Sequence, residues 1–472
     1  MEPWLKVSCI LCVFGFVREL RPSEPYHTEF LLGDTFNVTQ DQLNRDVYPI
    51  ATYSYLALLI VVFLVTDFLR YKPVIIANAI TGTFIWGLLL FCSTVWSLQI
   101  VEVFYGFYQA AEVAYYSYIY AKVDKKYYPI VTSHTRAAMF AGKLVAGLSA
   151  QALIMWKLMN YRGLVYISMA CKIVPNGVLV LDITKCLSFH SAQVLAMCWA
   201  FFLPRVQLSL YFHQKTPQAS NELQGHVNMA VSETTAPSEA SLSKGSESTA
   251  KSSIQPLQLL WLHFRSAYTN PMVVQWSLWY AVALAGYLQA TSYIQVLWKS
   301  FENEPSIVWN GAVDAAFTAL AAGFALMAGY LHAGRLKSRT SLIALAVFAL
   351  LEGGCILLAC WPKNIYLSYV GYTLFGGLFG FTITVASAEL AQSLVEDSFA
   401  LIFGINTLVA LILQTVLTLL VISGLQLGPI EQFVVYGFYF IAIGSIFFIV
   451  VAIQYVLGVK RNTNTHKIEV EG

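Results

Sequence analysis

The most informative chemical group in the chain is one carboxylate inside an apolar, aromatic-rich segment. Glu112 is preceded by Tyr108 at a spacing of four and followed by Tyr115 at a spacing of three, so a continuous helix places both rings on its face. A carboxylate flanked by phenol rings suits an organic cation, through ion pairing and cation–π contact. The alternative is that Glu112 bonds to neighbouring hydroxyls, or to Lys143 or Arg136.

Two other acidic residues are candidates for the same site. Glu24 lies between Pro22 and Pro25, where a helix must be interrupted, and the backbone groups freed at such a break tend to line a cavity. The alternative, which the sequence favours equally, is that Glu24 is a charged residue in an extracellular loop. Asp314 lies in an apolar segment of the second half of the chain. We expect its carboxylate either to line the same cavity or to be a site that takes up a proton.

A short charged segment separates two long apolar runs. Asp67, Arg70 and Lys72 place acid and base about one helical turn apart at a corner between two helices. Such a pair can latch two helices together in one conformation and release them in another. The alternative is a plain positive anchor with a local ion pair.

The sequence has no constellation for catalysis or for metal binding. No Gly-rich phosphate loop follows a strand, and no cluster of His, Cys and carboxylate residues has metal-ligand spacing. Cys9 and Cys12 have CxxC spacing, but they lie in an apolar run, where core packing is the better interpretation. We therefore expect no enzyme, no cofactor and no ATP-driven mechanism.

Composition indicates where these residues are held. Of 472 residues, 57% are hydrophobic and 11% are charged, whereas soluble proteins have about 25% charged residues. The formal net charge of +2 gives no field for a polyanionic partner. These values exclude a cytosolic enzyme and a nucleic-acid binder, and they predict the lipid bilayer as a partner. Oligomeric state is not indicated.

Twelve segments are long and apolar enough to cross a membrane. They predict an all-α polytopic membrane protein with twelve transmembrane helices in two six-helix bundles. The segments are 5–20, 48–69, 73–91, 98–122, 130–155, 163–204, 272–298, 310–333, 341–361, 365–393, 398–423 and 431–457.

The segments fall into two sets separated by polar sequence. We expect an N-terminal bundle over 1–204, a linker over 205–270, a C-terminal bundle over 271–459 and a cytoplasmic tail over 460–472. The linker is rich in Ser, Thr, Gln and Glu and cannot bury enough apolar surface to fold, so it is predicted to be disordered. Two six-helix halves joined by a cytoplasmic linker resemble the layout of the major facilitator superfamily.

Loop charges predict the orientation. Lysine and arginine gather after the even-numbered segments, which places those loops and both termini in the cytoplasm. The loop after the first segment is then extracellular, and it contains Asn37 in the sequon Asn-Val-Thr, a predicted glycosylation site.

One segment does not fit a single helix. Residues 163–204 are too long for one span, and their middle is too polar for two. We interpret 172–191 as a retained intron, because the codons for Cys171-Lys172 and for Phe189 to Ser191 allow splice-donor and splice-acceptor sequences. The alternative is a genuine extra hairpin or an extracellular excursion.

Several strings resemble the reduced folate carrier and thiamine carrier family. They include Arg-Pro-Ser-Glu-Pro at 21–25, Thr-Asp-Phe-Leu-Arg-Tyr-Lys-Pro-Val at 66–74, Ala-Ala-Glu-Val-Ala-Tyr-Tyr-Ser-Tyr-Ile at 110–119 and Ala-Leu-Ile-Phe-Gly-Ile-Asn-Thr at 400–407. The resemblance implies a plasma-membrane transporter of the major facilitator fold.

The resemblance also implies a substrate class. Three positions that are cationic in folate-type members correspond to Glu112, Gln414 and Gly376 here, which resembles the thiamine-type branch. By this resemblance, Glu24, Tyr48, Glu112 and Tyr115 line a thiamine site. Ala51 departs from the thiamine-type pattern, where a tryptophan stacks on the substrate, so another organic cation stays open.

Three functions compete at this point. The first is a secondary carrier that takes up thiamine, or a related small organic cation, by alternating access. The second is a carrier of the same family for reduced folate or another organic anion, which the absence of those three family cations opposes. The third is a membrane receptor that binds a vitamin without transporting it.

Overall fold

The fold is known from a computed structural model, in which part of the chain is described. The described residues are 2–33, 36, 38–69, 71–91, 93–112, 114–115, 118, 128–169, 256–301, 308–334, 338–361, 363–394 and 399–471. They form helices and no strand. Asn37, Arg70, the side chain of Asp67, the proposed insert 172–191 and most of the predicted linker lie outside this description, so those predictions stand untested.

The N-terminal half is built from long helices and a group of short ones. Its elements are α1 (Pro3–Glu19), η1 (Glu24–Tyr26), α2 (His27–Leu31), α3 (Gln40–Gln42), η2 (Leu43–Val47), α4 (Tyr48–Phe68), α5 (Lys72–Phe91), α6 (Val95–Ala110), α8 (Tyr128–Met155) and α9 (Tyr161–Met169). The interruption predicted around Glu24 is confirmed, because α1 ends at Glu19 and a 3₁₀ turn follows.

The C-terminal half consists of longer helices. Its elements are α13 (Pro256–Tyr268), α14 (Pro271–Lys299), α15 (Asn310–Gly334), α16 (Ser338–Cys360), α17 (Ile365–Gln392), α18 (Phe399–Thr418), η5 (Leu419–Gly424) and α19 (Pro429–Glu471). The side chains of Asn270 and Asn364 cap the first turns of α14 and α17, which explains why these helices begin where they do.

The helices agree with the predicted segments over their described parts, except that the segment predicted over 98–122 is interrupted by a turn at Ala111. Eight of the described helices are long and apolar enough to cross a membrane, so a polytopic all-α protein is confirmed, whereas the count of twelve stays a prediction. The domain boundaries stay predictions. Residues 256–268 of the predicted disordered linker form α13, and α19 runs through the predicted tail.

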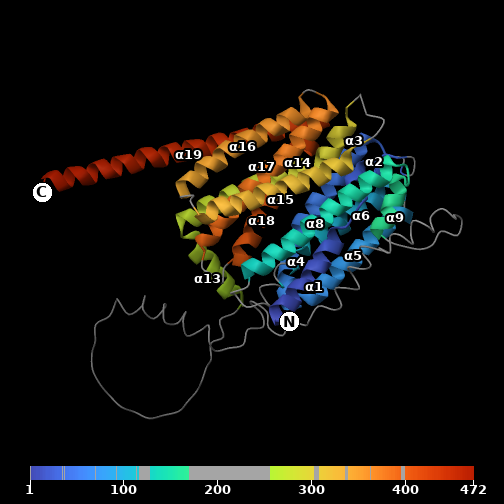
Figure 1. Ribbon diagram of the computed structural model, residues 1–472, viewed down its shortest axis with the longest axis horizontal. Helices are drawn as coiled ribbons and strands as arrows, with labels where there is room; N and C mark the ends of the chain where they lie inside the picture. Colours follow the sequence, from blue (N-terminus) through green and yellow to red (C-terminus); the bar gives the residue numbers. More distant parts are fainter. Residues whose placement is uncertain are drawn as a thin grey trace, which may run out of the picture.

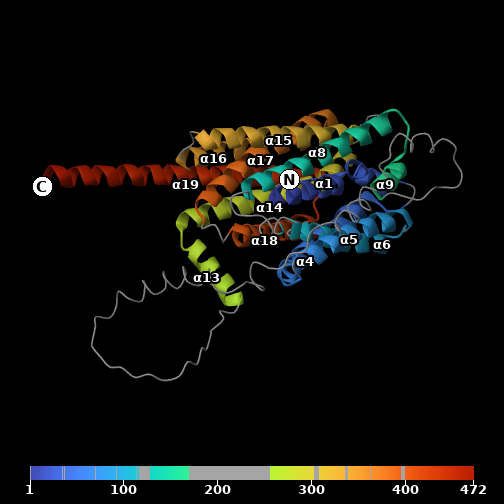
Figure 2. The same ribbon diagram turned by 60° about the horizontal axis from the view of Figure 1, so that its bottom comes forward.

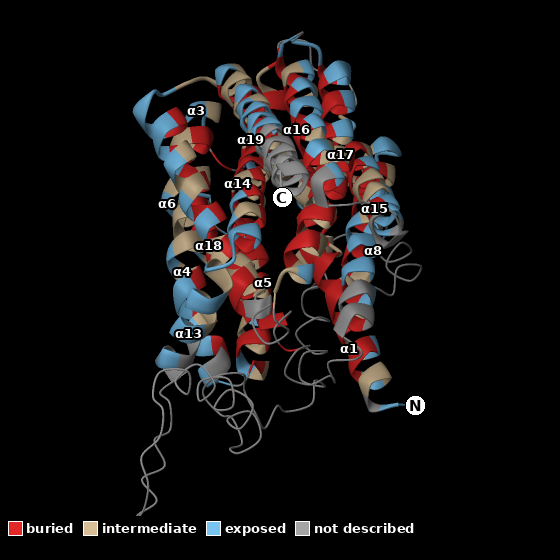
Figure 3. Cartoon of the chain, turned by 90° about the vertical axis from the view of Figure 1, so that its left-hand side faces the viewer, coloured by how far each residue is buried: buried red, intermediate tan, exposed pale blue. Residues whose placement is uncertain are grey.

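The helices lie side by side, and their outer surface is apolar. Figures 1 and 2 show the long helices of both halves running together, with α13 crossing at one end and α19 extending beyond the rest. In Figure 3 the buried residues gather toward the middle of the helix bundle and the exposed residues toward its outside. Large apolar side chains such as Ile60, Leu326 and Leu351 are among the exposed residues. An apolar outer surface of this kind is what a lipid environment requires.

The two halves meet along two seams, α8 against α15 and α4 against α18. At the first seam the backbones touch. A Cβ atom on Gly147 would lie 2.7 Å from the carbonyl oxygen of Gly311, and one on Gly311 would lie 2.8 Å from the carbonyl oxygen of Gly147. Only glycine permits this approach from both sides, as in other closely packed membrane helices.

Gly147→Ala is therefore expected to force α8 and α15 apart. Overpacking at such a site costs about 1–3 kcal/mol, so the purified variant should unfold at a lower temperature and its transport rate should fall. Gly323→Ala on α15 is the matched control, since its added Cβ meets no atom within 4 Å. Equal melting temperatures for the two variants would contradict the tight seam.

Candidate substrate site

A cavity of about 500 Å³ lies between the two halves. Its walls come from α1, η1, α2, α4, α5, α6 and α8 of the N-terminal half and from α14, α15, α17 and α18 of the C-terminal half. Positions on both sides of a cavity are what a carrier needs if each half is to contact the substrate as the halves rock.

The cavity wall is rich in ionisable groups, with more acids than bases. Its described acidic residues are Glu19, Glu24, Glu102, Glu112 and Asp314, and its described lysines and arginines are Arg18, Arg21 and Lys143. The balance of these formal charges is negative. A charge in a membrane-embedded cavity is costly, so such groups are retained for a function.

The three basic side chains meet at one buried carboxylate. Glu19 is 3% exposed, and its oxygens lie 2.9 Å from Arg21, 3.5 Å from Arg18 and 3.7 Å from Lys143. Charged groups this deeply buried require opposite partners. The last turn of α1 therefore holds an ion network that sequence reasoning missed. Three ionisable residues within four positions at the end of an apolar segment were the signal that could have found it.

Glu24 faces the cavity and is held from two sides. Its carboxylate accepts a 2.8 Å contact from the Arg21 guanidinium and a 2.6 Å hydrogen bond from the Tyr105 hydroxyl, while its side chain stays about one third exposed. The cavity alternative for Glu24 is thus the one the structure supports. The side chain of Tyr48 also lines the cavity, and its hydroxyl lies 2.7 Å from the Thr28 hydroxyl.

Glu112 also reaches the cavity, but its partner is not one of those considered from the sequence. Arg18 Nη2 lies 3.4 Å from Glu112 Oε2. The guanidinium of Arg18 also stacks over the Tyr108 ring, with Cζ 4.7 Å from the ring centre. The ring of Tyr108 lines the cavity as predicted, but its cation–π contacts are made with the chain's own arginines.

Tyr115 does not share that face, which corrects the prediction for it. Its hydroxyl donates a 2.8 Å hydrogen bond to the carbonyl oxygen of Leu11, its ring packs on Phe14, and its side chain is buried outside the cavity lining. The physical reason is that α6 ends at Ala110 and a turn at Ala111 precedes Glu112. The helical spacing assumed from Tyr108 to Tyr115 is therefore broken.

Two acidic side chains in the cavity are not paired with a base among the described residues. Asp314 lines it from α15 and Glu102 from α6, and neither carboxylate forms an ion pair or hydrogen bond with another described side chain. Asp314 was predicted, whereas Glu102 was missed because it stands near the start of its apolar segment. Among the described residues, Asp314 interacts electrostatically with Lys143 without forming an ion pair, whereas Glu102 has no such basic neighbour.

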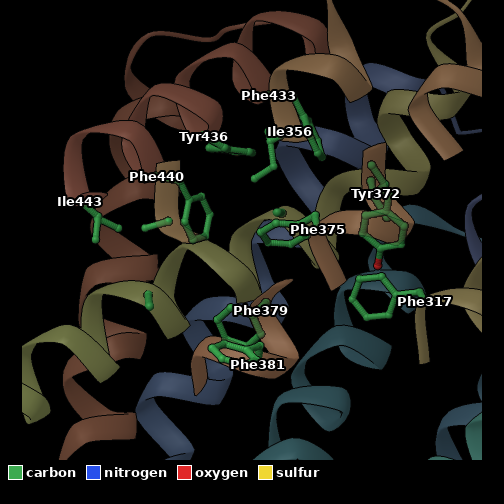
Figure 4. Close-up of a cluster of buried hydrophobic side chains, with 14 of the residues drawn as sticks. Phe317, Ile356, Tyr372, Phe375, Phe379, Phe381, Phe433, Tyr436, Phe440 and Ile443 are labelled. Carbon is green, nitrogen blue, oxygen red and sulfur yellow. The ribbon is translucent and has the colours of Figure 1, made fainter. Parts of the chain in front are cut away.

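The C-terminal wall of the cavity is aromatic. The rings of Tyr287 and Phe379 stack with centroids 4.0 Å apart, and those of Phe317 and Tyr372 stack at 4.5 Å. Figure 4 shows Phe317 and Tyr372 facing each other beside the larger cluster that includes Phe375. Flat rings beside acidic groups suit a heteroaromatic cation.

The described residues offer no group of three His, Cys, Asp or Glu side chains that would hold a metal ion.

A helical membrane protein with a charged cavity between two halves belongs to the class of solute carriers. The fold agrees: the crystal structure of the nucleoside transporter NupG superposes with a TM-score of 0.55 at 13% identity, over 95% of this chain and 98% of that one.

The chain belongs to the reduced folate carrier family, whose sequence profile matches residues 2–188 and 179–435. It is 35% identical to human thiamine transporter 2, over 94% of this chain and 89% of that protein. It is 36% identical to folate transporter 1 of Caenorhabditis elegans, over 94% and 91%, and 31% identical to the human reduced folate transporter, over 95% and 72%. It is thus a multi-pass membrane transporter, and overall identity does not separate the two substrate classes.

Proposed function

We propose that the chain takes up thiamine, or a closely related organic cation, across the plasma membrane by alternating access. The observation that carries this proposal is the charge balance of the cavity. The bases Arg18, Arg21 and Lys143 are engaged by acids of the chain itself, while Glu102 and Asp314 form no ion pair with a described base. The wall therefore attracts a cation and repels a folate dianion.

Two positions that are cationic in folate-type members of the family support a cationic substrate for this chain. Gln414 and Gly376 line the cavity without charge. An arginine could not stand at Gly376 in this arrangement, because even a Cβ atom there would overlap the ring of Phe317. The folate alternative draws on the relatives named as folate transporters, and it requires a substrate to displace acids from Arg18 and Arg21.

Contacts at one end of the molecule support alternating access. Lys299 forms a 3.0 Å ion pair with Glu29, and Gln295 bonds both the backbone N–H of Thr28 and the carbonyl of Glu24, so the halves are joined beside η1 and α2. We propose that this end faces the outside, that both termini are cytoplasmic, that Asn37 is glycosylated, and that Asp67, Arg70 and Lys72 form the latch at the opposite end.

Uptake measurements test the substrate. Cells expressing the full chain, with or without residues 172–191, are expected to accumulate labelled thiamine above vector-only cells and to accumulate no labelled reduced folate. Unlabelled thiamine should compete, and surface protein is quantified for each form. Folate uptake without thiamine uptake would overturn the proposal in favour of the anion carrier. Surface-expressed chain that binds thiamine but moves none would support the receptor alternative.

A further inference from the structure

We propose that Arg18 is an internal competitor for the substrate cation: it pairs with Glu112 in the empty carrier and gives up that contact, while it keeps the one with Glu19, when the cation binds. This inference deepens the proposed function by assigning a specificity-determining role to a residue outside the predicted site. It rests on geometry within the network at the end of α1.

The first observation is the unequal burial of the pair. Arg18 is 3% exposed, whereas the Glu112 side chain is 36% exposed toward the cavity that it lines. Arg18 lines the same cavity and its Nη2 lies against Glu112 Oε2, so a cation that enters the cavity meets a carboxylate already engaged by the guanidinium. Arg18 and the substrate cation thus share one acid.

The second observation is that Arg18 already has another acceptor. Its Nη1 lies 3.5 Å from Glu19 Oε1, which nearly equals the 3.4 Å from Nη2 to Glu112 Oε2. The guanidinium also lies over the Tyr108 ring, where Cζ is 4.7 Å from the centre. Release from Glu112 therefore leaves the buried arginine with an ion pair and a cation–π contact, so the exchange needs no unpaired buried charge.

The consequence is that Arg18 makes the binding affinity depend on the charge of the ligand. A cation gains the carboxylate of Glu112 only when Arg18 gives it up, and the apparent affinity is lowered by the fraction of carriers in which the acid is available. A cation that presents strong, localised charge displaces Arg18, whereas a neutral analogue of the same shape gains nothing from Glu112.

Removing the competitor should tighten binding. For Arg18→Met, the dissociation constant of N-benzylthiazolium on the detergent-purified full chain is expected to fall about tenfold if Arg18 holds Glu112 in about nine carriers of ten. Arg18→Lys retains a competing charge and should stay near wild type. Arg265→Met, on α13 and outside the cavity, is the control for handling and purity.

A double-mutant cycle separates competition from a structural effect. In a Glu112→Gln background there is no shared acid, so Arg18→Met should leave the dissociation constant unchanged. Thiamine uptake gives a second measurement, in which Arg18→Met lowers KM without raising the surface-normalised maximal rate. Weaker or unchanged binding in Arg18→Met, or equal effects of the mutation in both backgrounds, would overturn the inference.

The proposed function and this inference fail separately. Absence of thiamine uptake by the wild-type chain rejects the proposed function, while thiazolium binding still tests the competition. Normal thiamine uptake with no response of binding to Arg18→Met rejects the competition alone.

Discussion

Glu112→Arg is expected to abolish uptake of thiamine. The substitution reverses the charge of a side chain that lines the cavity and sets a second guanidinium beside Arg18. For a cation about 6 Å away and an effective dielectric near 20, the reversal weakens binding by about 5 kcal/mol. Uptake of labelled thiamine, normalised to surface protein, measures the loss.

Glu112→Gln distinguishes charge from folding in this experiment. The amide keeps the shape and removes only the charge, and Arg18 keeps its contact with Glu19. We expect thiamine affinity to fall by about 2–5 kcal/mol with surface expression near normal. Folate uptake should not arise in either variant, because Gln414 stays neutral. Near-native thiamine affinity in Glu112→Arg would show that the acid is structural. Another acidic residue of the cavity would then be the one that selects the cation.

The second large effect is expected at the two cavity acids, Glu102 and Asp314, that form no ion pair with a described base. Glu102→Gln and Asp314→Asn should each raise KM for the cation about 30-fold, which corresponds to about 2 kcal/mol at a distance of roughly 8 Å. The two losses should add, because the residues stand on α6 and α15 in different halves.

The matched control for these variants is Glu431→Gln, an exposed acid in the first turn of α19 and outside the cavity lining. It makes the same chemical change and should leave KM unchanged. KM values in Glu102→Gln and Asp314→Asn that match this control would mean that the surplus negative charge of the cavity has no part in binding.

Hydropathy was sufficient to predict the long helices, and Pro22 and Pro25 were sufficient to predict the break around Glu24. Both signals act locally along the chain. Hydropathy was also sufficient to single out Glu112, since one carboxylate in an aromatic run is rare. The pairing of Arg18 with Glu112 was not accessible in this way. The two residues belong to different helices, and nothing in helical periodicity states which helices will be neighbours.

The error at Tyr115 has a more local origin. A sequence of aromatic and small residues reads as one continuous helix, and the turn at Ala111 has no proline or glycine to announce it. Spacing arguments hold only while the helix is unbroken, so the face assigned to Tyr108 could not be extended to Tyr115.

The reciprocal contact of Gly147 and Gly311 has a mechanical consequence. The two backbones meet directly here, and the Gln151 side chain of α8 also accepts a hydrogen bond from the Ala312 N–H and donates one to the Val308 carbonyl, so α8 and α15 are held close together at this point. At the other seam, Phe63 stands against Gly404, where an added Cβ atom would lie 3.5 Å from the ring, so side chains separate the helices. We therefore expect the axis about which the two bundles rotate to lie near α8 and α15. The larger displacement is then expected at α4 and α18.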